Sequence, residues 1–158
     1  MSSWLRLSVI VTVVIAALAY APAPSAAETC KAAEGRALKL MRRLDAAGQG
    51  AVTIGARCMF HGTDAKAVAK LSTIARSTFA DLGRQGPPDP ACVKVGAFDK
   101  AVGTLANSMG QRLGLAWALC SAEAQATVEA MTAKQAPQAD IEAAVGKLAQ
   151  AWLTDQLK

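Results

Sequence analysis

One short segment of this sequence groups side chains that could bind a metal: Cys58-Met59-Phe60-His61 places a thiol, a thioether and the only histidine within four residues. Such soft ligands suit copper, and a histidine with a distant methionine can ligate haem. Zinc would need three or four ligands at spacings that are absent here, and no C-x-x-C-H motif for covalent haem occurs. We therefore interpret Met59 as a core side chain and His61 as a helix end before Gly62, and we expect no metal and no cofactor.

Catalytic arrangements are scarcer still. A catalytic triad would have to use His61, and no serine lies in a G-x-S-x-G setting. The carboxylates of Asp140 and Glu142 are two residues apart, so on a helix they point in different directions and are better placed to complement the helix dipole. The sequence therefore favours a non-enzymatic protein.

Four cysteines, at positions 30, 58, 92 and 120, predict two disulfides, and three pairings are open from the sequence alone. The intervals from Cys30 to Cys58 and from Cys92 to Cys120 both span 28 residues, which indicates either a duplicated helical hairpin or chance. An unbroken helix over 28 residues would separate its ends by about 42 Å, so a 92–120 bridge requires a turn near Gly110. If a helix that starts at Cys30 ends and an extended chain then returns to Cys58, the two cysteines come close together. This arrangement favours the 30–58 pairing.

The N-terminal segment has the features of a cleaved secretory signal. Arg6 precedes an apolar run over residues 7–21, and Ser25 and Ala27 occupy the small-residue positions of a cleavage site. We expect residues 1–27 to be the signal peptide and residues 28–158 to form a single disulfide-bonded helical domain, secreted or periplasmic. An apolar run of about 15 residues is shorter than the roughly 20 that span a bilayer, so we expect no stable membrane anchor.

Apolar residues recur at helical spacing along most of the remaining chain. A first helix is expected between Thr29, as its cap, and Ala47, with Gly48-Gln49-Gly50 ending it. A second is expected to open at Thr63 or Asp64 and to close at Gly83. Its apolar face comprises Val68, Leu71, Ala75, Phe79 and Leu82.

The C-terminal half predicts further helices. One should begin at Asp89-Pro90 and meet Gly110 and Gly114, either of which could break or bend it. Its expected apolar face comprises Val93, Ala97, Ala101, Leu105 and Met109, and the pattern resumes at Leu113, Trp117, Cys120, Ala124, Val128 and Met131. Pro137 should interrupt the pattern before a last helix, whose apolar face comprises Ile141, Val145, Leu148 and Trp152.

The resulting fold class is all-α: a small antiparallel helical bundle of four to five helices stapled by two disulfides. Residues 51–62 are the exception, because Val52 and Ile54 alternate with polar or small residues as in a strand. No second alternating run could pair with them, so we expect an extended chain or a short helix there.

Composition narrows the function. The chain carries a net charge of +5 with its basic residues spread out, and aromatic residues make up only 4%, so we expect no nucleic-acid partner. The favoured function is an exported helical interaction module that binds a protein partner, such as one it inhibits or regulates. The alternative is a carrier of a small apolar ligand, a lipid or haem, held between helices near His61, Met59, Trp117 and Trp152.

Overall fold

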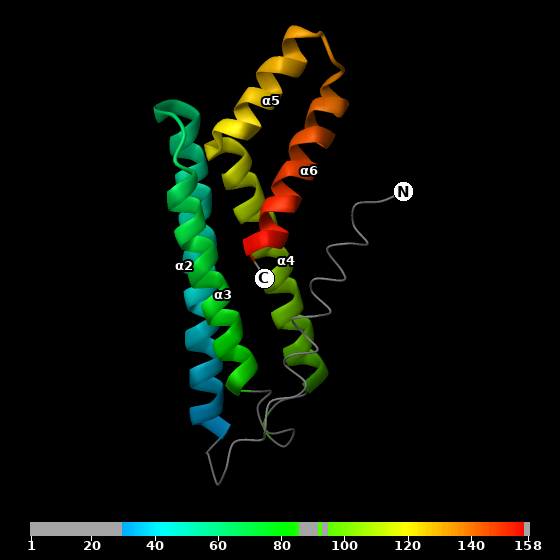
Figure 1. Ribbon diagram of the computed structural model, residues 1–158. Coiled ribbons are helices and arrows are strands. Elements are labelled where there is room, and N and C mark those ends of the chain that lie inside the picture. Colours follow the sequence, from blue (N-terminus) through cyan, green and yellow to red (C-terminus); the bar gives the residue numbers. More distant parts are fainter. Residues whose placement is uncertain (1–29, 86–91, 93–94, 157–158) are drawn as a thin grey trace. The chain divides into compact units, whose positions relative to one another are not determined.

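The structure is a computed structural model that describes residues 30–85, 92 and 95–156. These residues form five helices, and none of them lies in a strand (Figure 1). The helices are α2 (Cys30–His61), α3 (Ala65–Gln85), α4 (Val95–Cys120), α5 (Ala122–Ala133) and α6 (Gln138–Gln156). The predicted all-α fold with four to five helices and two disulfides is confirmed. The predicted signal peptide, the Thr29 cap and the helix start at Asp89-Pro90 lie outside the described residues.

The disulfides join Cys30 to Cys92 and Cys58 to Cys120. The favoured pairing of Cys30 with Cys58 is wrong, because both cysteines lie on the unbroken helix α2, about 42 Å apart. Each bridge spans 62 residues of sequence. Both bridges connect the same two segments, and the equal spacing of the cysteines within them gives both bridges the same sequence separation.

Helix α2 continues where the sequence predicted an end. Gly48 and Gly50 lie inside it, and residues 51–61, expected to be extended or a short helix, complete it. Gly50 has a packing role, since a Cβ atom there would lie 3.4 Å from the side-chain methyl carbons of Leu71 on α3. Tertiary packing therefore overrides the weak helix propensity of this glycine-rich segment.

Helix α4 likewise runs through Gly110 and Gly114 without a break. A Cβ atom at Gly114 would lie 3.1 Å from Leu153 Cδ1, so this glycine permits close packing of α6. The break comes at Ser121 instead, inside the predicted continuous apolar pattern. The Ser121 hydroxyl accepts a hydrogen bond from the backbone N–H of Ala124 and caps α5.

The chain divides into two compact units, and the boundary falls within α2, α3 and α4. The first unit comprises residues up to Ala46 together with Ile74–Met109, and it contains the Cys30–Cys92 disulfide. Three helix segments supply its buried side chains. They are Ala37 and Leu44 of α2, Ala75, Thr78 and Leu82 of α3, and Phe98, Val102 and Met109 of α4.

The start of α4 buries a different face from the predicted one. Ala97 and Ala101 are exposed, whereas Phe98 and Val102, one position later, are buried. The larger apolar side chains gain more free energy from burial than alanines do, so they determine which face turns inward.

The second unit comprises Ala47–Thr73 and Gly110–Lys158. Its core includes the Cys58–Cys120 disulfide and Trp117, whose indole stacks on that of Trp152 with ring centroids 5.7 Å apart. Near the C-terminal end of α6, the Gln156 side chain accepts a hydrogen bond of 3.0 Å from the buried Ser72 hydroxyl of α3.

Helices α5 and α6 form a hairpin at the end of the second unit (Figure 1). Helix α5 ends at Ala133, and Gln135 adopts a left-handed φ of 55° in the turn. The backbone N–H of Ala136 closes the turn on the carbonyl of Met131 at 3.0 Å. Helix α6 begins directly after Pro137, which confirms the predicted interruption there.

Within the part of the chain that the structure describes, no helix is both long enough and apolar enough to cross a bilayer. Two disulfides are typical of a protein that folds in an oxidising compartment.

The two disulfides differ in their access to reductant, which gives a testable order of reduction. Cys58 and Cys120 are 3% and 0% exposed, whereas Cys30 is exposed and Cys92 half-buried. Because thiol exchange needs access to a sulfur atom, we expect graded dithiothreitol to open the 30–92 bridge first. Alkylation at each step, followed by peptide mass spectrometry, measures the order. Simultaneous opening, or opening of 58–120 first, would contradict this assignment of access.

Candidate functional site

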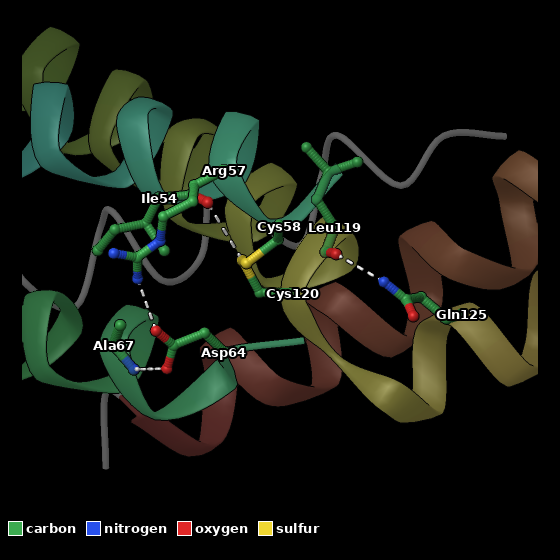
Figure 2. The surroundings of a disulfide bond; sticks show 8 residues. All are labelled: Ile54, Arg57, Cys58, Asp64, Ala67, Leu119, Cys120 and Gln125. Carbon is green, nitrogen blue, oxygen red and sulfur yellow. Dashed lines mark hydrogen bonds and ion pairs between the residues drawn. A yellow bond between two sulfur atoms is a disulfide. The ribbon is translucent and has the colours of Figure 1, made fainter. Parts of the chain in front are cut away.

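The buried Cys58–Cys120 disulfide is the junction of the second unit (Figure 2). It joins the last turn of α2 to the last residue of α4, and α3 and α5 both begin within a few residues of it. The Cys120 Sγ atom lies 3.6 Å from the Ile54 carbonyl oxygen. In the chain-entropy account, closing a loop of this length stabilises a fold by about 4 kcal/mol, so this bond is a major local constraint.

Backbone and side-chain hydrogen bonds complete the junction. The N–H of Asp64 donates to the carbonyl of Cys120 at 3.0 Å. The Asp64 carboxylate caps α3 by accepting from the N–H of Ala67 and pairs with the Arg57 guanidinium at 2.7 Å (Figure 2). The Gln125 amide donates to the Leu119 carbonyl at the end of α4. At these helix ends, backbone groups that have no partner within their own helix thus find hydrogen-bond partners. These bonds fix the geometry of the surface around them.

One turn before the disulfide, α2 and α4 pack with little space between their backbones. A Cβ atom at Gly55 would lie 3.2 Å from Ala116 Cα and 3.4 Å from Leu119 Cδ1. The small residues Gly55 and Ala116 permit this close approach of the two helices.

Four large apolar side chains in the second unit are exposed near this contact, and we call them the apolar stripe. They are Val52 (50% exposed), Met59 (63%) and Phe60 (79%) on α2, and Leu115 (63%) on α4.

Helix geometry places Val52 and Met59 beside the Gly55 contact, whereas Phe60 lies farther around α2, about 140° from Gly55. Val52 and Met59 are three residues before and four residues after Gly55, so they share its side of α2. Successive residues turn by about 100° on a helix, and this puts Met59 and Cys58 on opposite sides of Gly55. The disulfide therefore lies on one side of the α2–α4 contact, and Val52 and Met59 lie on the other.

The α4 side of the contact has the same arrangement. Leu115 is one turn before Leu119, whose side chain faces Gly55, while Cys120 lies on the other side of Ala116. Residues of both helices thus contribute to one apolar surface that is held by the adjacent disulfide.

The four residues of the predicted ligand pocket differ in their exposure to solvent. Trp117 and Trp152 come together, and Trp117 is 5% exposed, in agreement with core packing. Met59 and His61 are both exposed at the end of α2, so the interpretation of Met59 as a core residue is wrong. A ligand pocket built from these four residues stays a prediction.

All four cysteines are bonded in disulfides. Among the described residues, no group of three or more histidine, cysteine or acidic side chains is placed to hold a metal ion.

Sequence reasoning missed three of the four stripe residues: Val52, Phe60 and Leu115. Residues 52, 56, 59 and 60 follow the spacing of one helix face, and this pattern is visible in the sequence once α2 is taken to continue through residues 51–61. The strand-like alternation of residues 51–57 concealed it.

Comparisons with protein-family models, with curated proteins and with solved structures give no match. The functional assignment therefore rests on this chain's own residues and their geometry.

The close α2–α4 contact predicts opposite outcomes for two glycine substitutions on the same helix. Gly35→Ala meets no atom within 4 Å, so we expect it to stabilise the fold by about 1 kcal/mol through helix propensity. Gly55→Ala forces its methyl group against the Ala116 backbone, and we expect a net loss of about 1 to 3 kcal/mol. Urea unfolding monitored by circular dichroism measures both. Equal stabilisation by the two substitutions would show that the helices do not approach closely at Gly55.

Proposed function

We propose that this chain is an exported, non-enzymatic helical module that binds another protein through the apolar stripe. The predicted signal peptide supports export, and the two disulfides fit a secreted or periplasmic location. Inhibition or regulation of the bound partner would suit such a module.

The observation that carries this proposal is the exposure of Phe60, Met59, Val52 and Leu115. Helix geometry puts Val52, Met59 and Leu115 on the same side of the α2–α4 contact. Large apolar side chains that gather on a surface mark interaction sites more often than single ones do. An aromatic residue such as Phe60 can anchor an interface by filling a pocket on the partner.

The scaffold under the apolar stripe supports the same function. The buried Cys58–Cys120 bond ties together the two helices that carry the stripe, on the other side of their contact, and the Asp64 contacts fix the start of α3. A surface that is already ordered before binding loses less conformational entropy when a partner docks.

Charge favours a different protein over a second copy of this chain. The chain carries a net charge of +5, so two copies repel each other as they approach. A partner with acidic groups around an apolar helix face would be attracted instead, and such a helix matches the elongated form of the stripe along α2.

The carrier of a small apolar ligand is the alternative function. Its expected aromatic residues, Trp117 and Trp152, stack on each other with an interplanar angle of 17°, so each covers a ring face of the other. This arrangement favours the protein-binding module over the carrier. Native mass spectrometry and a visible absorption spectrum of protein purified from its own host test the alternative, because a co-purifying lipid mass or a haem Soret band would support the carrier.

A photo-crosslinking amino acid at position 60, used in the native host, tests the proposed function directly. We expect one protein to be crosslinked from position 60 and not from position 128, an exposed control position on α5. With that protein purified, Phe60→Ser and Met59→Ser together should weaken binding by about 30-fold or more, because the loss of even one anchor residue costs about 2 kcal/mol or more. The matched control Val128→Ser should leave the affinity within about 2-fold.

Circular dichroism and the urea midpoint of each variant check that the fold is intact, as expected for substitutions of exposed side chains. Equal affinity of the Phe60→Ser, Met59→Ser variant and the unsubstituted chain would reject the apolar stripe as the binding surface.

A further inference from the structure

The first unit carries a different kind of surface on the N-terminal half of α2. Four basic side chains, all exposed, occur within eight residues, and we call them the basic cluster: Arg36, Lys39, Arg42 and Arg43. No acidic residue lies between Glu34 and Asp45, so the cluster is a region of one sign of charge.

The basic cluster faces away from the core of its unit. Ala37 and Leu44 are the buried residues of this part of α2 and define its inward side. Lys39 and Arg42 lie between them in sequence and, at about 100° per residue, point to the opposite side of the helix. Lys39 and Arg43 are four residues apart, a spacing at which like charges destabilise a helix. An anionic surface would relieve this repulsion.

We propose that the basic cluster docks the exported chain reversibly on an anionic lipid surface. Four basic residues on one exposed helix face have the density that attracts anionic headgroups. Leu38 is 43% exposed next to Lys39 and supplies an apolar side chain that can enter the headgroup region. Attachment of this kind needs no membrane-spanning helix.

Two features favour a lipid surface over other anionic partners. Residues 30–46 contain no aromatic side chain on which the bases of a single-stranded nucleic acid could stack. No acidic residue is interspersed with the basic ones between positions 34 and 45. The cluster therefore has no alternating charge pattern that would fix the position of a protein partner along the helix. A sheet of headgroup phosphates requires no such fixed position.

The basic cluster shares no residue with the apolar stripe, so this inference does not depend on the proposed protein partner.

Vesicle sedimentation of the chain purified from its own host tests the proposal. Vesicles of one part phosphatidylglycerol to two parts phosphatidylcholine should bind the protein, and pure phosphatidylcholine should not. Lys39→Gln, Arg42→Gln and Arg43→Gln together should lower the partition coefficient on the order of 100-fold, at about 5-fold for each charge near the surface. Raising the salt from about 0.01 M to about 1 M should release the protein, since it shortens the Debye length from about 30 Å to about 3 Å.

The matched control removes the same number of charges from exposed positions in the second unit: Lys66→Gln, Lys70→Gln and Lys134→Gln. We expect it to change partitioning by less than about 3-fold, because these charges lie outside the cluster. Equal losses in the two triple variants would show that only net charge matters and would overturn the proposal. Binding to pure phosphatidylcholine, or complete displacement from vesicles by equimolar polyglutamate or single-stranded DNA, would overturn it as well.

Discussion

The covalent bond between Cys58 and Cys120 is the constraint on which the second unit depends. It ties the end of α2 to the end of α4, and the carbonyl of Cys120 then accepts the N–H of Asp64 at the start of α3. Ser121, the next residue, caps α5. The beginnings and ends of four helices are thus set within a few residues of one bond. The candidate binding surface takes its rigidity from this junction.

Small residues determine how the helices pack around that bond. Gly55 faces Ala116, and Gly114 faces Leu153, so backbones approach where larger side chains would separate them. Close approach leaves little room for large apolar residues inside, and alanine contributes little buried area. The disulfides compensate for a core of this kind. Large apolar side chains such as Phe60 and Leu115 remain on the surface, where they are available to a partner.

The sequence was sufficient to predict the helical class, two disulfides, a helix cap at Thr63 or Asp64 and the break at Pro137, because each depends on local chemistry or on composition. It was insufficient for the disulfide pairing and for the length of α2. Gly48 and Gly50 have the local signature of a helix end, but α2 continues through them, and Leu71 of α3 lies over Gly50. The exposed surface around Phe60 depends on the continuation of α2 beyond these glycines. The error in the predicted end of this helix therefore concealed the candidate site.

The shared 62-residue offset of the two disulfides limits how this chain can change in length during evolution. A single deletion inside α2, between Cys30 and Cys58, would turn every later residue of that interval by about 100° and shift it by about 1.5 Å. Cys58 would then point away from Cys120, and a matching deletion between Cys92 and Cys120 would turn Cys120 in the same sense and leave the two side chains pointing apart. Length variation among descendants of this gene should therefore be concentrated in the connections between helices.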